Sequence, residues 1–308
     1  MRLPKFLAAL TLGGIGYAVA LSLATSRIKR FEDVDLASAN VPGRFIEVEG
    51  IRLHLLEQGE GEPIVLIHGL GGSTFSFRFT IPALAERYRV VALDLKGFGY
   101  SARPPKGDYS LTAQAELVVG LMNQLGIERT AIVGHSMGGG VAMRVALTSP
   151  ERVSRLILVD SVGGSTEERR RRFGFLARPF LPFVAAFALG RSKAFERGLR
   201  SAVHDPTFVT PEVVEGYTRP FRVKGHLRSL ETFVASGRRD GDLPLEDISQ
   251  PALVLWGEHD RWLRLAQGEE LARRIPEARL DVVPAAGHLP LEEQPDYCNA
   301  AILALLSS

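Results

Sequence analysis

Six short, mostly apolar runs recur along the chain, and each ends at turn-forming residues. Buried strands of a parallel sheet have this pattern because helices cover both of their faces. Segments with helical spacing lie between several runs, which favours right-handed crossover connections. The runs are 64–67, 90–93, 131–133, 156–159, 252–256 and 280–283, and the helical segments include 113–125, 139–147 and 265–275. The pattern predicts an α/β fold with a mostly parallel central sheet and helices on both faces.

A hairpin precedes these runs, and one long interval interrupts them. Residues 44–48 and 51–56 predict two antiparallel strands joined at Glu49-Gly50. From about 164 to 245 no comparable strand occurs, and the sequence is apolar, Arg-rich and helical in character. Such an insertion is expected to lie over the ends of the sheet strands. We therefore expect an α/β core from residues 31–163 and 246–308, with a helical cap at 164–245.

The first thirty residues have a different character from the rest. Arg2 and Lys5 precede an uncharged stretch at 6–26, and further basic residues follow it. A helix of that length spans roughly 31 Å, enough to cross the bilayer core. We expect a membrane-associated protein held by this single N-terminal helix. The alternative is a cleaved signal peptide, with a small-residue site at 18–20 and a secreted or periplasmic product.

The overall composition excludes several classes of function. The 308 residues carry a formal net charge of only +2, so nothing global indicates a nucleic-acid partner. Cys298 is the single cysteine, which excludes an internal disulfide framework and a Cys-rich zinc site. Its expected role is packing within the last helix.

A Gly-x-Ser-x-Gly motif at 134–138 follows the expected strand at 131–133 and leads directly into a helical segment. A serine nucleophile needs this setting, because a sharp, strained turn projects its hydroxyl out of the sheet. Glycines two residues before and after the serine leave room for the neighbouring strand and helix. The pentapeptide alone is a weak signal, but the strand and helix around it make Ser136 the candidate nucleophile.

A serine hydroxyl is a poor nucleophile until a base accepts its proton. His288 is the best candidate among the seven histidines, because it lies in the loop after the expected strand at 280–283. Active sites of open α/β sheets form at the carboxyl ends of strands. We therefore assign His288 as the general base.

The base needs an acid that fixes its tautomer and stabilises its charged form. Asp260 lies in the turn that leaves the strand at 252–256. The resulting order of serine, aspartate and histidine along the chain is the one expected for a hydrolase sheet of this kind. Glu258 and His259 compete with Asp260 in the same turn.

The tetrahedral intermediate needs donors for its oxyanion, and backbone N–H groups suit this role because the fold fixes them. We expect one from Met137, directly after the nucleophile. The other is expected from Leu70, in the Gly-rich loop at 68–73 that follows a strand. The loop lacks the Gly-Lys-Ser/Thr ending of a phosphate-binding loop and the spacing of a dinucleotide fingerprint.

The stretch from about 44 to 306 resembles the α/β-hydrolase superfamily, and within it the capped esterase and lipase branch that includes monoacylglycerol lipases. The motifs that carry the resemblance are His68-Gly69 after a strand, 94–101, the turn at Ser136, and the loops of Asp260 and His288. The resemblance implies that the Asp94 motif shapes a loop near the site. It specifies the fold far better than the substrate, because one fold hosts many reactions.

Ser136 and His135 differ from the residues that some superfamily members carry at these positions, and the differences narrow the set of expected reactions. Relatives that hydrolyse epoxides or haloalkanes use an aspartate nucleophile, whereas this chain has Ser136. Relatives that cleave carbon–carbon bonds often carry asparagine before the serine, whereas His135 stands here, as in many esterases. We expect His135 to face away from the nucleophile.

The cap sequence combines aromatic and basic residues. An apolar acyl-binding face with a basic rim against an anionic membrane would explain them. Packing of the aromatic residues on the core and solvation of the arginines would explain them equally well. The residues are Phe173, Phe175, Phe180, Phe183, Phe187, Phe195, Arg169–Arg172, Arg178, Arg191, Arg197 and Arg200.

The leading hypothesis is a serine hydrolase of apolar or amphiphilic carboxylic esters, such as a monoacylglycerol, that works through an acyl-enzyme. It needs no metal or organic cofactor. One alternative is a hydrolase that cleaves a carbon–carbon bond of a vinylogous diketone with the same three residues. A third hypothesis is a ligand-binding protein that kept the pocket and lost turnover.

Overall fold

A computed structural model describes residues 32–36, 41–163, 192–236 and 241–307 of the chain. The expected N-terminal helix at 1–30 and the first part of the expected cap, including the aromatic residues from Phe173 to Phe187, lie outside these residues. No helix within the described ranges is long and apolar enough to cross a membrane. The division of the chain into core and cap stays a prediction.

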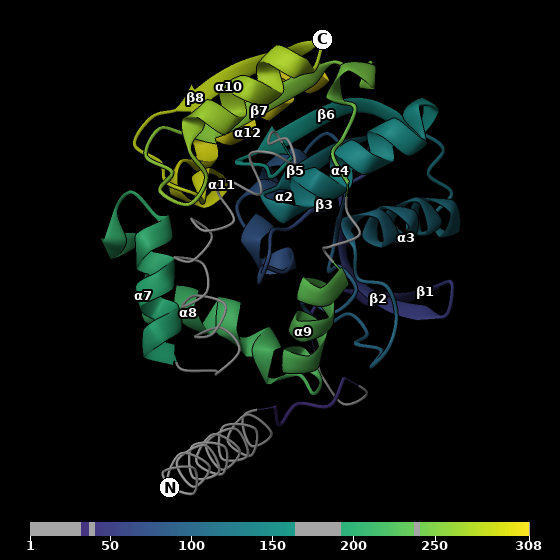
Figure 1. The fold of residues 1–308 in the computed structure, drawn as a ribbon, viewed down its shortest axis with the longest axis vertical. Helices are drawn as coiled ribbons and strands as arrows, with labels where there is room; N and C mark the ends of the chain where they lie inside the picture. The colour runs from purple at the N-terminus through teal and green to yellow at the C-terminus, as the bar shows by residue number, and fades with distance from the viewer. Residues whose placement is uncertain (1–31, 37–40, 164–191, 237–240, 308) are drawn as a thin grey trace, which may run out of the picture.

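An eight-stranded, mostly parallel sheet forms the centre of the molecule, which confirms the expected α/β-hydrolase fold (Figure 1). Its spatial order is β1-β2-β4-β3-β5-β6-β7-β8. Only the pairs β1–β2 and β2–β4 are antiparallel. The strands are β1 Arg44–Val48, β2 Ile51–Gln58, β3 Pro63–Ile67, β4 Arg89–Leu93, β5 Thr130–His135, β6 Val153–Val159, β7 Ala252–Gly257 and β8 Ala278–Val283.

Helices cover both faces of this sheet (Figure 1). Because side chains alternate across a strand, Val65 and Ile67 of β3 pack with one buried cluster, whereas Ile64 and Leu66 pack with the other. The first cluster includes α3, α4 and α10, and the second includes α2, α11 and α12. The bounds are α2 Thr80–Leu84, α3 Leu111–Gln124, α4 Met137–Thr148, α10 Leu265–Arg274, α11 Pro290–Glu293 and α12 Pro295–Leu306.

The helices expected at 113–125, 139–147 and 265–275 are therefore present, with ends that differ by one or two residues. Missing from the sequence analysis are the short 3-10 helix η1 Thr74–Phe77 and α2, which follow β3. Cys298 is fully buried in α12, and its thiol donates to the carbonyl of Pro290, as expected for a packing role. Other 3-10 helices are η2 Pro150–Arg152, η3 Pro206–Phe208, η4 Arg219–Arg222 and η6 Leu245–Asp247.

Among the described residues between β6 and β7, three α-helices lie away from the sheet, and we call them the cap helices (Figure 1). They are α7 Ser192–Ala202, α8 Pro211–Thr218 and α9 His226–Ser236. They share a third apolar cluster in which Phe195, Tyr217 and Leu230 are buried. Leu289, from the loop that carries His288, belongs to the same cluster. The cap helices therefore pack against the edge of the sheet where the candidate site lies.

Candidate active site

Ser136 occupies a strained turn between β5 and α4. Its backbone has φ 52° and ψ −115°, a region that side-chain-bearing residues rarely adopt. The turn is tight: a Cβ on Gly138 would lie 2.1 Å from the carbonyl oxygen of Ile67. Glycine is therefore required there, and the strain is held in place by the packed strand and helix on either side.

Ser136, His288 and Asp260 form a continuous line of hydrogen bonds. The Nδ1 atom of His288 lies 2.7 Å from Oδ2 of Asp260, and its Nε2 atom lies 3.0 Å from Oγ of Ser136. Because a carboxylate only accepts, Nδ1 carries the ring hydrogen and Nε2 is left to accept from the serine. The structure thus brings together three residues that are 152 and 28 positions apart in sequence.

Asp260 is held in its orientation by its own turn. Its Oδ1 atom accepts the N–H groups of Trp262 at 2.7 Å and Leu263 at 2.9 Å. Its side chain is fully buried against His288. The sequence competitors lie elsewhere: the side chains of Glu258 and His259 are 50% and 42% exposed and contact each other. Asp260 is therefore the acid that the geometry places on His288.

The loop that carries His288 is hydrogen-bonded to the end of α7. The N–H of His288 donates to the carbonyl of Ala202 at 2.6 Å. The carboxylate of Glu293 accepts from Gly287 at 2.8 Å and from His204 at 2.6 Å, so it joins both segments. A Cβ on Gly287 would lie 2.2 Å from the carbonyl oxygen of Ala202. The position of His288 therefore depends on the cap helices as well as on the sheet.

Leu70 and Met137, the expected oxyanion donors, lie in segments on either side of Ser136. Met137 is the first residue of α4, so its N–H has no acceptor within the helix. Gly72 donates to the carbonyl of Gly69, which forms a tight turn around Leu70. Leu70 lines the same pocket as Ser136 and His288. Both amides thus belong to the segments that border the nucleophile.

The pocket above Ser136 encloses about 490 Å³, open solvent at its mouth included. Most side chains along it are apolar or aromatic, and no Lys or Arg occurs among its described lining residues. They are Gly69, Leu70, Gly71, Gly72, Ser76, His135, Ser136, Phe195, Leu199, Tyr217, Trp262, His288 and Leu289. A larger hollow of about 1270 Å³ is lined by Phe75, Gly216 and others but contains neither Ser136 nor His288. The chemistry therefore places the candidate site in the smaller pocket.

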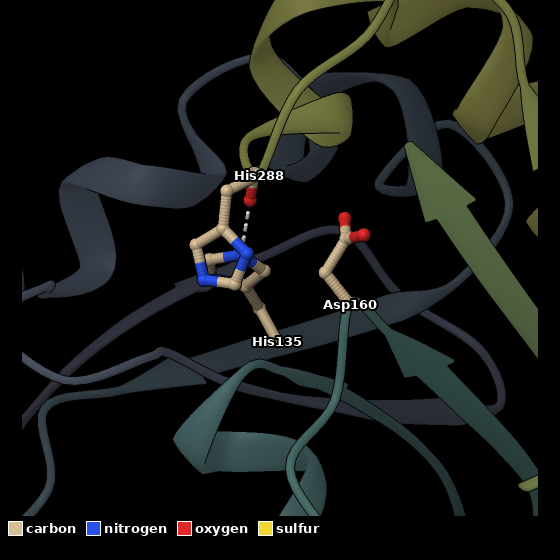
Figure 2. A group of neighbouring side chains, drawn as sticks. All are labelled: His135, Asp160 and His288. Carbon is tan, nitrogen blue, oxygen red and sulfur yellow. Dashed lines mark hydrogen bonds between the residues drawn. The ribbon is translucent and has the colours of Figure 1, made fainter. Parts of the chain in front are cut away.

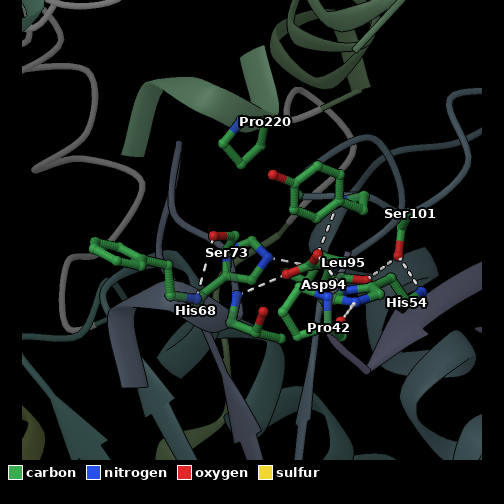
Figure 3. Close-up of polar contacts among 12 residues, drawn as sticks. Pro42, His54, His68, Ser73, Asp94, Leu95, Ser101 and Pro220 are labelled. Carbon is green, nitrogen blue, oxygen red and sulfur yellow. Dashed lines mark hydrogen bonds and ion pairs between the residues drawn. The ribbon is translucent and has the colours of Figure 1, made fainter. Parts of the chain in front are cut away.

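Hydrogen bonds to the Asp94 carboxylate hold the loop that carries Leu70 in position. Its Oδ1 atom accepts from the N–H of Thr74 at 2.7 Å, and its Oδ2 atom accepts from Tyr100 at 2.7 Å and from His54 at 2.7 Å (Figure 3). A Cβ on Gly99 would lie 2.0 Å from the Asp94 carboxyl carbon. This confirms that the Asp94 motif shapes a loop beside the site.

His68 fixes the start of the same loop. Leu95 donates its N–H to Nε2 of His68 at 3.1 Å, so the ring hydrogen is on Nδ1, which donates to the carbonyl of Gly69 at 2.7 Å (Figure 3). Burial lowers the pKa of His68 and keeps the ring neutral, although the nearby Asp94 charge opposes this. A neutral ring in one tautomer holds the Gly69 peptide in a single orientation.

The prediction that His135 faces away from the nucleophile is wrong. His135 lines the pocket, and its Nε2 atom donates to the carbonyl of His288 at 2.8 Å. The two imidazole rings lie 5.1 Å apart. Burial, followed by the proximity of His288, lowers the pKa of His135 to about 3, so the ring is neutral. His135 is the last residue of β5, and its hydrogen bond to a residue 153 positions away has no signal in the local sequence.

The sequence analysis also missed Asp160. This residue follows β6 directly, is fully buried and lies beside Asp260. An aspartate directly after an apolar run is the signal that could have marked it as a candidate, although its partner Asp260 could not be inferred from that signal.

A scan of protein families identifies this fold independently. A family model described as the alpha/beta hydrolase fold matches residues 62–295. The chain belongs to the α/β-hydrolase family. The match spans the segment between β2 and α12 and includes all three residues of the hydrogen-bonded line.

Relatives within the family differ in the reactions that their names state. An uncharacterised hydrolase of Bacillus subtilis is 31% identical over 85% of this chain and 96% of its own length. A 2-hydroxymuconate semialdehyde hydrolase of Pseudomonas putida is 34% identical over 80% of this chain and 87% of its own. A crystal structure of a membrane phospholipase A, described as a bacterial virulence factor, covers 99% of this chain and 98% of its own, at 29% identity and a TM-score of 0.75. The family is thus established, and these relatives do not define one substrate.

Proposed function

We propose that this protein hydrolyses apolar or amphiphilic carboxylic esters through a covalent acyl-enzyme. The observation that carries the proposal is the line from Ser136 through His288 to Asp260 at the floor of an apolar pocket. A nucleophile, a base and an orienting acid in mutual contact are the minimum set for acyl transfer.

The reaction follows from the contacts of each residue. Ser136 Oγ attacks the ester carbonyl while its proton passes to Nε2 of His288, and Asp260 stabilises the resulting imidazolium. The N–H groups of Leu70 and Met137 donate to the oxyanion of the tetrahedral intermediate. Its collapse breaks the C–O bond, and His288 returns the proton to the leaving alcohol. Water then attacks the acyl-enzyme by the same route and releases the carboxylic acid.

The pocket lining supports an uncharged, apolar acyl group. Phe195, Leu199 and Trp262 border the nucleophile, and burial of an acyl chain against them would contribute about 0.8 kcal/mol per methylene. A monoacylglycerol or a similar lipid ester combines such a chain with a small polar head group. The named activity of the similar membrane phospholipase A, which is also a lipid esterase, adds to this support.

Attachment to a membrane by residues 1–30 belongs to the same proposal. Support comes from the basic residues on both sides of the uncharged stretch and from the similarity to the membrane phospholipase A over 99% of this chain. A helix anchored there would hold the pocket close to lipid substrates. Cleavage of the segment and release of the remaining chain is the alternative that N-terminal sequencing of the purified protein would detect.

Carbon–carbon bond hydrolysis is a second candidate, because the relative that is 34% identical is named for a 2-hydroxymuconate semialdehyde substrate. The same three residues would serve that reaction. The ester stays our first proposal because most side chains along the described lining of the pocket are apolar or aromatic.

The test measures hydrolysis of p-nitrophenyl esters from acetate to palmitate by the detergent-solubilised full chain and its Ser136→Ala variant. We expect activity that rises with acyl length and falls about 10⁴-fold or more in the variant. A vinylogous diketone is assayed beside the esters. Turnover of the diketone alone would replace the ester proposal, and a chain that neither turns over substrate nor reacts with a fluorophosphonate would be a binding protein.

A further inference from the structure

Asp160 is a buried acid that the reaction described above does not use. It follows β6, which lies between β5 with Ser136 and β7 with Asp260. Its backbone has φ 41°, so a side-chain-bearing residue is held in the left-handed region. It is 0% exposed. Backbone strain and the burial of a carboxyl both cost folding free energy, so a role for Asp160 is expected.

The contacts of Asp160 leave one of its oxygens without a donor. Oδ1 accepts the N–H of Gly257 at 3.0 Å, and Oδ2 has no hydrogen-bond donor among the described residues. Asp260 is its neighbour because β6 pairs with β7, and the N–H of Asp160 donates to the carbonyl of Leu255 in β7 at 3.0 Å. Figure 2 shows Asp160 beside His135 and His288, and their ligand atoms all lie within 4.8 Å of one another.

The surroundings of Asp160 favour its neutral form. Burial raises its pKa well above the ordinary value, and the charges of Asp260 and Glu293 raise it further. His135 offers no compensating charge, since it is neutral and donates to the carbonyl of His288. The one stabilising contact of the charged form is the Gly257 N–H. Burial and these charges therefore favour the protonated form of Asp160, and Asp260 is the neighbouring carboxyl that could accept its O–H.

Asp260 has room for that donor. Its Oδ1 atom accepts two backbone N–H groups, and its Oδ2 atom accepts Nδ1 of His288. A carboxylate has about four acceptor positions, so one stays open. We propose that the carboxylic O–H of Asp160 donates to Asp260 and holds it in line with His288, which makes Asp160 a positioning residue.

This proposal rests on the proposed hydrolase function. No proton is transferred from Asp160 during turnover; it keeps its O–H while the serine proton moves to His288 and back. The same cluster could be imagined as a metal site with His135 and His288. Both ring nitrogens of His288 are already bonded to Asp260 and Ser136, so a metal there would break the line.

The matched variants Asp160→Asn and Asp160→Ala test the proposal. Asparagine keeps an acceptor for Gly257 and a neutral donor for Asp260, whereas alanine keeps neither. We expect Asp160→Asn to retain kcat within about threefold, and Asp160→Ala to lower kcat about 10- to 100-fold with little change in KM, a loss typical of a positioning contact. The acid limb of the pH–rate profile should move to higher pH in Asp160→Ala only, because a carboxylate with fewer donors holds the imidazolium more strongly.

The pH dependence of the rate at which a fluorophosphonate labels Ser136 also reports the position of the acid limb, and it requires no substrate. If the full chain labels but hydrolyses no ester, the proposed ester function fails while the labelling rates still test Asp160. Equal losses in both variants, with the acid limb moved to lower pH, would mean that Asp160 acts as an anion. Unchanged labelling per folded molecule in both would reduce Asp160 to a structural role.

Infrared spectroscopy tests the proton directly and does not depend on whether Asp160→Ala folds. We expect the carbonyl band of a buried, protonated carboxylic acid in the parent chain and its loss in Asp160→Asn. A parent without this band, or activity of the parent that a chelator abolishes, would overturn the proposal.

Discussion

Two buried histidine–aspartate pairs occur in the sheet and in the loops that follow its strands, and their rings differ in the partner of the second nitrogen. His288 and His54 each place Nδ1 2.7 Å from an aspartate oxygen. The second nitrogen of His288 faces the hydroxyl of Ser136, which can donate. The second nitrogen of His54 faces the carbonyl of Pro42 at 2.7 Å, which can only accept.

That single difference decides what each pair can do. Both nitrogens of His54 face acceptors, so the ring is best satisfied as an imidazolium. Burial opposes that charge, but the hydrogen bond and charge of Asp94 outweigh it and raise the pKa of His54. His288 can stay neutral and accept the serine proton. A buried histidine–aspartate pair is thus an ion pair where the second ring nitrogen faces a carbonyl. It can serve catalysis where that nitrogen faces a hydroxyl.

The largest expected contrast comes from the same substitution at the two histidines. His288→Gln should lower kcat about 10⁴-fold or more with little loss of stability, because glutamine cannot accept and return the proton. His54→Gln should lower the free energy of unfolding by about 3 kcal/mol, because it leaves Asp94 charged and buried. Its kcat per folded molecule should fall less than about fivefold.

Steady-state kinetics and urea unfolding of both variants check this contrast. A His54→Gln variant that stays stable but loses activity as completely as His288→Gln would remove the distinction between the two pairs.

A smaller effect is expected from pH, and it concerns the His54–Asp94 pair. A raised pKa of His54 means that its stabilisation is complete below the ordinary value of 6.5 and is lost as the pH rises through the folded value. The pKa of Asp94 is lowered by His54 against the effect of burial, so its stabilisation is lost as the pH falls below the ordinary value of 3.8. The difference in unfolding free energy between the parent and His54→Gln should therefore peak between these values.

Urea unfolding of both chains at several pH values measures that difference. A difference that grows steadily above pH 6.5 would show that His54 is neutral in the folded protein, and the two pairs would then be electrostatically alike.

The smallest expected effects on stability come from the serine beside each pair. Ser101 accepts the N–H of His54 at 2.9 Å and donates to the carbonyl of Asp94, so Ser101→Ala should cost about 1 to 2 kcal/mol of stability and little activity. Ser136→Ala should leave stability within about 0.5 kcal/mol of the parent and abolish hydrolysis. Thermal unfolding of the two variants is the measurement. A larger stability loss in Ser136→Ala than in Ser101→Ala would contradict the assignment of the two serines.

Most of the sheet and the line of Ser136, His288 and Asp260 could be predicted because their signals are local. Each buried strand shows as a run of three to five mostly apolar residues, and Ser136, Asp260 and His288 each lie within five residues after such a run. The order of these motifs along the chain then places them at one edge of a parallel sheet. The antiparallel hairpin was visible for the same reason, from its turn at Glu49-Gly50.

The contacts that escaped prediction depend on which strands become neighbours. His54 meets Asp94 because β2 lies beside β4, and Asp160 meets Asp260 because β6 lies beside β7. Apolar periodicity does not encode strand order, so neither pair has a signature in local sequence. The orientation of His135 was predicted wrongly for a related reason, because its hydrogen-bond acceptor is the backbone carbonyl of His288, 153 residues away.

The hydrogen bond from His288 to Ala202 bears on how proteins of this family can be recombined. Substrate scope is often altered by exchanging the helices above a conserved sheet between relatives. Here the last residue of α7 is also a backbone support of the histidine. A chimaera joined at the ends of β6 and β7 would keep Ser136 and Asp260 in their parental surroundings. The N–H of His288 would then have to bond to a segment from the other relative. Grafts that retain the parental 202–204 stretch are therefore the ones whose new specificity can be measured.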